Sequence, residues 1–268
     1  GMIPHIVFRH NDPDYFPGPA IWDNNTEPPT SGHSQPPVLA SIIWRFVQMG
    51  TDYDKRKAIE VFPKLMAYHR WFSNARDPNN RGIISIIHPW ESGRDNCPDW
   101  DIGMQNIVIP GNLERYTRRD TSHVDSNQRP TQDQYDRFIT IVNFGRECDW
   151  DSQTIYANGP FLMADPGVQF IFLRASRDLL AMAHHLEMDL AVDEIKGWVE
   201  QVEAGSDFLW NDVVGGYCAR DLRTGQFSDA ITNASTLSFF ADVGSPEQRK
   251  SMEAHCRRIL SASAFGMP

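Results

Sequence analysis

The sequence predicts an all-α fold, arranged either as an array of helical hairpins or as a helical toroid. Seven segments carry apolar residues at the three- and four-residue spacing of an amphipathic helix, and almost no segment alternates as a strand does. Only a few residues separate the first two of these segments, which favours an antiparallel hairpin. With 268 residues, of which 41% are hydrophobic and 22% charged, the chain is large enough for a packed core.

The N-terminal part of the chain begins irregularly and then becomes helical. Prolines interrupt any helix in the first 35 residues, at Pro13, Pro17, Pro19, Pro28 and Pro29. Helical patterning begins at Pro36 and Pro37 and ends at Gly50, which is the usual distribution of proline and glycine at helix ends. A second helix is predicted over 53–76, where Pro63 should kink or restart it.

A long segment without periodicity separates these helices from the remaining five. Residues 77–129 are rich in Gly, Pro, Asn, Arg and Asp, and a loop-rich stretch of this length inside a domain is usually functional. A short strand pair is predicted there, between 83–87 and 107–109. The later helices are predicted at 131–148, 166–187, 192–211, 229–241 and 246–261.

Composition and charge exclude several classes of protein. The net charge is −10 and no cluster of Lys or Arg is present, so a nucleic-acid partner is not expected. No apolar run approaches the ~20 residues of a membrane span, and no signal peptide is visible, so a cytoplasmic protein is expected. No CxxC pair occurs, which indicates free, buried thiols at Cys97, Cys148, Cys218 and Cys256.

The segment His88-Pro-Trp-Glu-Ser-Gly-Arg-Asp-Asn-Cys-Pro-Asp-Trp-Asp101 combines four carboxylates with two tryptophans. Two carboxylates beside aromatic surfaces are what cleavage of a glycosidic bond requires. A surface loop stabilised by Asx-turns is the alternative interpretation. A calcium loop fits the spacing less well. His88 has no histidine partner at a useful spacing, so no metal site is predicted.

This segment resembles the acid-bearing loop of glycoside hydrolase family sixty-three, in particular its mannosylglycerate hydrolase-like branch. Other stretches resemble the same family in the same order: GMIPHIVF, SGHSQPPVLA, RRDTSHVDSNQRPTQDQYDRF, GGYCARDLRTG and AFGMP. The resemblance implies an (α/α)6 toroid, as in trehalases and glucoamylase-like enzymes, that cleaves an α-glycosidic bond with inversion. Residues 1–268 would form part of one such catalytic domain, which is incomplete because seven of twelve helices are predicted.

The resemblance assigns roles to six residues and implies no cofactor. Asp95 matches the general acid, which must hold a proton at working pH and therefore calls for apolar surroundings and nearby negative charge. The matching substrate contacts are Gln35, Trp90, Gly93, Arg129 and, by a weaker match, His5. Glu91 is expected to set the loop by pairing with Arg94 or Arg129, with Asp99 and Asp101 in supporting positions.

The general base of the family lies beyond the matching segments, so it is expected outside this chain. Three hypotheses follow. The chain could belong to an inverting hydrolase of a small α-glycoside such as mannosylglycerate or of a glucosyl oligosaccharide, to a non-catalytic sugar-binding remnant, or to a toroid enzyme of another chemistry such as a sugar epimerase. The expected partner is a small carbohydrate. Self-association is a further expectation, because helices beside a gap in a toroid expose apolar faces.

Overall fold

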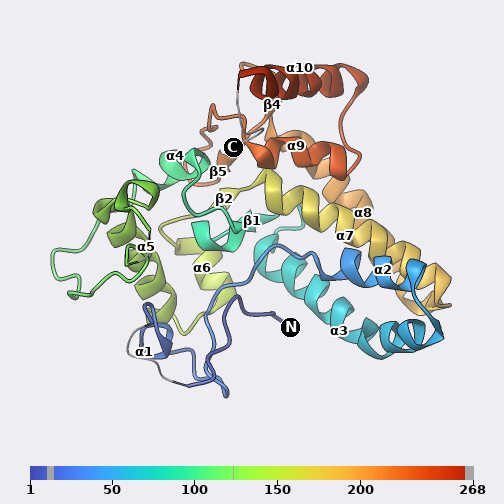
Figure 1. Cartoon of the computed structure of the whole chain (residues 1–268), viewed down its shortest axis with the longest axis horizontal. Helices are drawn as coiled ribbons and strands as arrows, with labels where there is room; N and C mark the ends of the chain where they lie inside the picture. The colour runs from blue at the N-terminus through green and yellow to red at the C-terminus, as the bar shows by residue number, and fades with distance from the viewer. Residues whose placement is uncertain (11–14, 123, 263–268) are drawn as a thin grey trace.

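The computed structural model describes residues 1–10, 15–122 and 124–262 and is predominantly helical (Figure 1). The AFGMP motif lies outside these residues. Seven helices in the described part have eight residues or more, which confirms the predicted number: α2 (Leu39–Met49), α3 (Asp52–Arg76), α5 (Gln132–Glu147), α7 (Pro166–His185), α8 (Asp189–Gly205), α9 (Asn233–Phe240) and α10 (Pro246–Ala262). Three shorter helices were not predicted: α1 (Pro19–Trp22), α4 (Asp101–Met104) and α6 (Ser152–Asn158).

Side-chain caps explain where several helices begin. Thr131 and Gln134 form a capping box at the start of α5, in which the Gln134 amide donates to the Thr131 hydroxyl oxygen at 3.2 Å. Asp165 accepts hydrogen bonds from the Gly167 and Val168 amides at the start of α7. The helix predicted over 229–241 begins later, at Asn233, because Thr232 caps it. Pro63 lies inside α3, which continues as one helix through it.

Helix α7 occupies the centre of the fold. It packs against α8, α9 and α2, and α2 also packs against α3 (Figure 1). One hydrophobic cluster contains buried residues of α2, α3, α7 and α8, including Phe62, Leu179 and Trp198. A larger cluster joins α5 and α7 to the loops between them. The helical bundle therefore forms a rigid support for the irregular segments that carry the candidate site.

The strands are short and pair differently from the prediction. β1 (Ser85–Ile86) pairs antiparallel with β2 (Met163–Ala164), and β2 pairs with β5 (Arg220–Asp221). A second pair joins β3 (Trp210–Asn211) to β4 (Gly216–Tyr217). The predicted partner of 83–87 was 107–109, which was wrong, because Ile107 packs into the core instead of joining a sheet. The small central sheet fixes the end of the loop that leads to Trp90.

Buried histidines make stability depend on pH, and His69 of α3 is the clearest example. Its Nδ1–H donates to the Leu65 carbonyl at 3.0 Å, and Nε2 has no partner among the described residues. Burial lowers the pKa of His69 to about 4. The unfolded chain, with a pKa of about 6.5, therefore binds a proton that the folded chain does not, so this contribution to stability is complete above pH 6.5 and is lost as pH falls towards 4.

We therefore expect the melting temperature of the wild-type protein to fall as the pH is lowered from 7.5 to 4.5. It should fall less in His69→Gln, because glutamine has no group that titrates in this range. Differential scanning calorimetry at several pH values measures both proteins. His69→Gln is expected to be the less stable protein at pH 7.5, since the ring stacks between Phe172 and Trp198. Parallel pH curves for the two proteins would contradict the assignment.

Candidate active site

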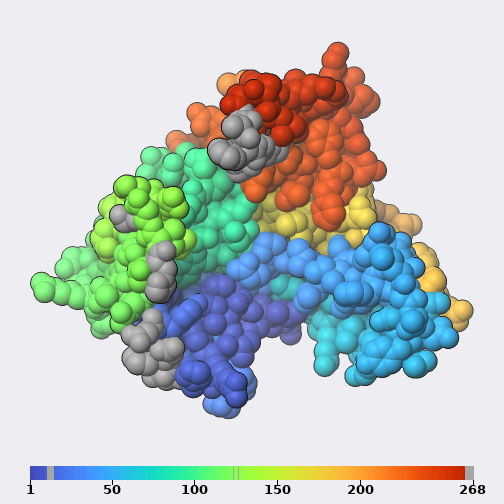
Figure 2. Space-filling model, in the orientation of Figure 1, coloured from blue at the N-terminus to red at the C-terminus, as the bar shows by residue number. Residues whose placement is uncertain are grey.

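The six residues assigned from the sequence lie around one pocket of about 580 Å³: His5, Gln35, Trp90, Gly93, Asp95 and Arg129. The pocket also includes Tyr15, Phe16, Arg119, Asp120 and Tyr135. Figure 2 shows the dark blue N-terminal segment close to the green segments, and residues of both line the pocket. The Asn96 side-chain amide donates to the Gln128 carbonyl at 3.1 Å, so the loops 83–110 and 118–130 meet beside the pocket.

His88 holds Trp90 in place by a hydrogen bond and a ring contact. The Trp90 amide donates to His88 Nδ1 at 3.0 Å, while His88 Nε2–H donates to the Phe138 carbonyl at 3.2 Å. These contacts define a neutral ring, and burial lowers the pKa of His88 well below its usual value. The two rings are 4.3 Å apart, so the histidine fixes the tryptophan at the pocket wall and is not a metal ligand.

Gln35 and Gly93 form the neighbouring part of the wall. Gln35 Nε2 donates to the Trp90 carbonyl at 3.1 Å, which holds the amide group against the loop. Gly93 has a φ of +69°, a conformation that favours glycine, and a Cβ there would lie 3.4 Å from Gln35 Oε1. A side chain at this position would therefore both strain the backbone and crowd the Gln35 amide.

His5 also lines the pocket and is half-buried. Its Nδ1 is 3.1 Å from Ser31 Oγ, and its backbone amide donates to the His33 carbonyl at 2.8 Å. Burial lowers the pKa of His5, against the opposing effect of the negative charges of Glu91 and Asp95. His5 therefore faces the pocket mainly as a neutral hydrogen-bonding group.

Arg129 is oriented by Asp120, a residue that the sequence analysis did not single out. Arg129 Nε donates to Asp120 Oδ2 at 3.2 Å, and Arg118 donates to both oxygens of the same carboxylate at 3.0 and 2.6 Å. Burial would raise the pKa of Asp120, but the hydrogen bonds and charges of the two arginines lower it overall. Asp120 therefore stays ionised, and among the described residues it binds the Nε edge of the Arg129 guanidinium.

Glu91 has a structural role, but its predicted partners were wrong. It binds Arg76 rather than Arg94 or Arg129, through bonds of 2.6 and 3.0 Å between side chains that are 4% and 2% exposed. The amides of Ser34 and Ile87 also donate to Glu91, both at 3.1 Å. One buried carboxylate thus joins the end of α3, the segment before Gln35 and the start of the segment 88–101, which is called the acidic loop below.

Asp95 lies half-buried in a turn and lines two cavities. Beside the pocket described above is a second cavity of about 580 Å³, which Asp95 and Arg129 also border. Within the described residues, no side chain or amide donates a hydrogen bond to the Asp95 carboxylate. Both carboxyl oxygens are therefore open to a ligand that occupies either cavity.

The remaining acidic residues are in supporting positions or outside the pocket. Asp99 is buried and bound to Arg94, whereas Asp101 is exposed in the first turn of α4. Asp221 accepts hydrogen bonds from the Arg223 amide and the Thr224 hydroxyl, so it stabilises a turn. Across the described residues, no three His, Cys, Asp or Glu side chains gather as a set that could hold a metal ion.

All four cysteines are free, as predicted, but the predicted burial was wrong for three of them, because only Cys218 is buried and Cys97, Cys148 and Cys256 are partly exposed. None of the described helices combines the length and the apolar character needed to cross a lipid bilayer. Of the pocket residues that sequence reasoning missed, Arg119, Asp120 and Tyr135 lie within the quoted stretch 118–138, whereas Tyr15 and Phe16 lie in the irregular N-terminal segment, outside every quoted stretch.

The helical fold is that of a glycoside hydrolase domain. The structure superimposes on that of a GH63 mannosylglycerate hydrolase from Thermus thermophilus, in complex with Tris, with a TM-score of 0.91 at 38% identity, over 96% of this chain and 61% of the other. A complex of that hydrolase with glucose gives a TM-score of 0.85 at 37% identity, over 96% and 62%.

Sequence comparisons agree. A mannosylglycerate hydrolase of Thermus thermophilus is 41% identical over 92% of this chain and 60% of its own length, and mannosylglycerate hydrolase MGH1 of Selaginella moellendorffii is 38% identical over 100% and 55%. The glucosylglycerate hydrolase of Mycolicibacterium hassiacum is 35% identical over 76% and 49%. The chain thus spans about half to three fifths of the length of these relatives.

The model of the mannosylglycerate hydrolase MGH1-like glycoside hydrolase domain matches residues 1–268. The chain belongs to this family.

Proposed function

We propose that this pocket binds a small, negatively charged α-glycoside of the mannosylglycerate type and contributes the general acid for its hydrolysis. The observation that carries the proposal is the meeting of His5, Gln35, Trp90, Asp95 and Arg129 at one pocket. An aromatic side chain, hydrogen-bonding amides, a carboxyl group and an arginine are together the groups that a glycoside with a carboxylate requires. The names of the related hydrolases support the same substrate class.

The position of Asp95 between two cavities supports its assignment as the acid. A glycoside that occupies both cavities would have its scissile oxygen at the boundary, where Asp95 lies. Proton donation to that oxygen releases the leaving group as a neutral alcohol. No side chain or amide among the described residues donates to the carboxyl group, which leaves both of its oxygens open to the ligand.

We also propose that the reaction inverts the anomeric carbon and that the general base is not among the described carboxylates of this pocket. Besides Asp95, the carboxylate that lines it is Asp120. Asp120 is held by Arg118 and Arg129, which stabilise its charge and occupy its oxygens. A carboxylate with these partners is a weak base for activating water. A further segment would therefore supply the base.

Binding and cleavage of mannosylglycerate by this chain test the proposal together. Calorimetry measures binding, and proton NMR follows cleavage, with and without azide as an external nucleophile in place of the activated water. We expect binding, and cleavage that azide accelerates, with the β-mannosyl azide as the first product. An α product would contradict inversion. Binding without cleavage in either condition would favour the alternative function, a non-catalytic sugar-binding domain, and no binding would contradict both.

Arg129 is expected to select for the carboxylate of the substrate. Arg129→Leu should weaken binding of mannosylglycerate by about 10- to 100-fold, which corresponds to a charge-assisted hydrogen bond of about 1.5–3 kcal/mol. Binding of mannose, which has no carboxylate, should change little and is the internal control. Calorimetry with both ligands measures the difference, and an equal loss for both would show that Arg129 binds hydroxyl groups instead.

A further inference from the structure

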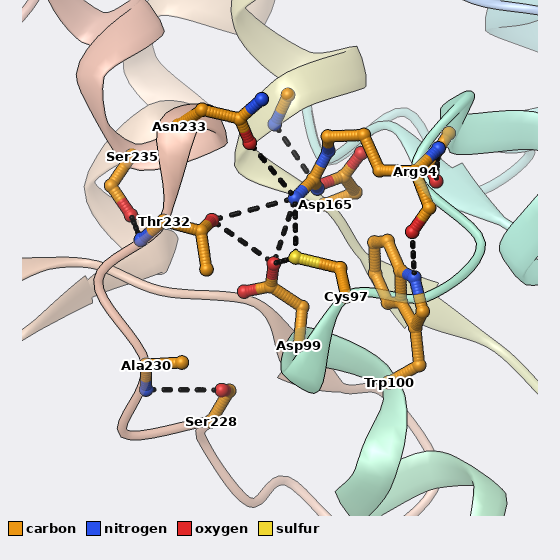
Figure 3. Close-up of polar contacts among 12 residues, drawn as sticks. Arg94, Cys97, Asp99, Trp100, Asp165, Ser228, Ala230, Thr232, Asn233 and Ser235 are labelled. Carbon is orange, nitrogen blue, oxygen red and sulfur yellow. Dashed lines mark hydrogen bonds and ion pairs between the residues drawn. The ribbon is translucent and has the colours of Figure 1, made fainter. Parts of the chain in front are cut away.

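Arg94, the residue immediately before Asp95 in the chain, is the centre of a cluster of polar side chains (Figure 3). The Arg94 guanidinium donates from Nη1 to Asp99 Oδ2 at 2.8 Å and from Nη2 to Asp165 Oδ1 at 2.7 Å. The two carboxylates are 1% and 0% exposed, and Arg94 is 14% exposed. Arg94 therefore neutralises negative charge inside the protein while the next residue, Asp95, faces the pocket.

Each partner of Arg94 belongs to a different part of the fold. Asp165 also caps the N-terminus of α7, where it accepts from the Gly167 and Val168 amides. Thr232 precedes α9, and its hydroxyl donates to Asp99 Oδ2 at 3.0 Å. Through these contacts one guanidinium fixes the acidic loop to the beginnings of two helices (Figure 3).

The backbone around Arg94 is held as firmly as its side chain. Its carbonyl accepts hydrogen bonds from Trp100 Nε1 at 2.8 Å and from the Cys97 amide at 3.1 Å, and its own amide donates to Ser92 Oγ at 2.9 Å. The guanidinium carbon also lies 5.0 Å from the centre of the Trp100 ring. The carbonyl and the amide of Arg94 are thus both held, although no described residue donates a hydrogen bond to the Asp95 carboxylate.

We propose that Arg94 is a positioning residue, which holds the carboxyl group of Asp95 at the boundary between the two cavities by clamping the acidic loop to Asp99 and Asp165. The inference rests on the proposed function in taking Asp95 as the acid. A planar fork with two anchored ends is required, because Lys would offer one point charge and could not reach both carboxylates in the same geometry. A loop freed at one end would move Asp95 relative to the scissile oxygen.

The first measurement is the carboxyl signal of Asp95 in the carbon-13 NMR spectrum of protein labelled at the aspartate carboxyl carbon. Asp95→Asn removes the signal and so assigns it. In Arg94→Lys we expect this signal to shift or split, and in Asp165→Asn, which keeps an oxygen to cap α7, to shift less in the same sense. The control is Arg223→Lys, in which the Asp95 signal should not change. Arg223 also bridges two segments, because it donates to the carbonyls of Ile155, Tyr156, Ala157 and Gly159.

The second measurement is cleavage of mannosylglycerate, for which Arg94→Lys should lower kcat by about 10- to 100-fold with little change in KM. A merely structural role would lower the melting temperature and leave the Asp95 signal of the folded protein in place. That unchanged signal, in Arg94→Lys and Asp165→Asn alike, would overturn the proposal. If Arg94→Lys does not fold, Asp165→Asn decides. If the wild-type chain cleaves nothing, the proposed function fails, but the Asp95 signal still tests the clamp.

Discussion

Replacement of Asp95 by asparagine is expected to lower kcat for the cleavage of mannosylglycerate by about 10²- to 10⁴-fold. The asparagine amide has nearly the same shape as the carboxyl group, but it cannot give up a proton to the leaving oxygen. Binding should be retained, because the sugar contacts at Gln35, Trp90 and Arg129 are unchanged. Steady-state kinetics with azide present, together with calorimetry, separates the two effects.

Two comparisons make this result specific to proton donation. Asp101→Asn is the matched control, since Asp101 belongs to the same acidic segment but is exposed at the start of α4. It should keep the wild-type rate. An α-mannosyl fluoride is the second comparison, because fluoride leaves without being protonated, so Asp95→Asn should lose much less activity on it. A full rate of Asp95→Asn on mannosylglycerate would remove Asp95 from the acid role.

The residues of the candidate site were taken from the family resemblance, and the structure places them at one pocket. His5, Gln35, Trp90, Asp95 and Arg129 come from four separated stretches, and all of them line one cavity. Asp120 was missed although it lies in a quoted stretch. Its role is to orient Arg129, and a pairing between side chains nine residues apart in an irregular loop leaves no periodic pattern.

The ion-pair partner of Glu91 could not be predicted from the local sequence. Arg94 and Arg129 were predicted because both belong to loops near Glu91 in the expected site. Arg76 was overlooked because it ends α3, where a basic residue is commonly exposed and interacts with the helix dipole. Its burial depends on how α3 meets the loop, which is a tertiary property.

The fold was predictable where periodicity was long and not where elements were short. Helices α3 and α7 follow their predicted ranges closely. Helix α6 has seven residues and β1 has two, too few for a helical or strand period to be recognised. The pairing of β1 with β2 joins residues 85 and 164, so it is fixed by the packing of α7 against the sheet and not by neighbouring residues.

The second large effect is expected for stability, at the buried pair of Glu91 and Arg76. Glu91→Gln should lower the free energy of unfolding by about 3–5 kcal/mol, because it leaves the Arg76 charge buried without its counterion. The Ser34 and Ile87 amides would also share a single remaining oxygen acceptor. Urea denaturation measures the change, which should exceed that of most single substitutions.

The chain contains a matched control for this substitution. Arg70 and Glu194 form an equally direct two-bonded pair, at 2.6 Å for both bonds, but their side chains are 52% and 37% exposed. Glu194→Gln should cost about 1 kcal/mol or less, because water solvates the arginine that remains. Equal losses of stability in Glu91→Gln and Glu194→Gln would contradict the assignment of the large effect to burial.

Replacing both members of the buried pair separates the cost of an unpaired charge from the value of the pair. The double variant Arg76→Met with Glu91→Leu should recover a large part of the stability lost in Glu91→Gln, since neither charge remains. The double variant should recover less of the ligand binding than of the stability. Glu91 accepts from the Ser34 amide next to Gln35 and lies between Trp90 and Gly93, so without its carboxylate these pocket residues lose their common anchor.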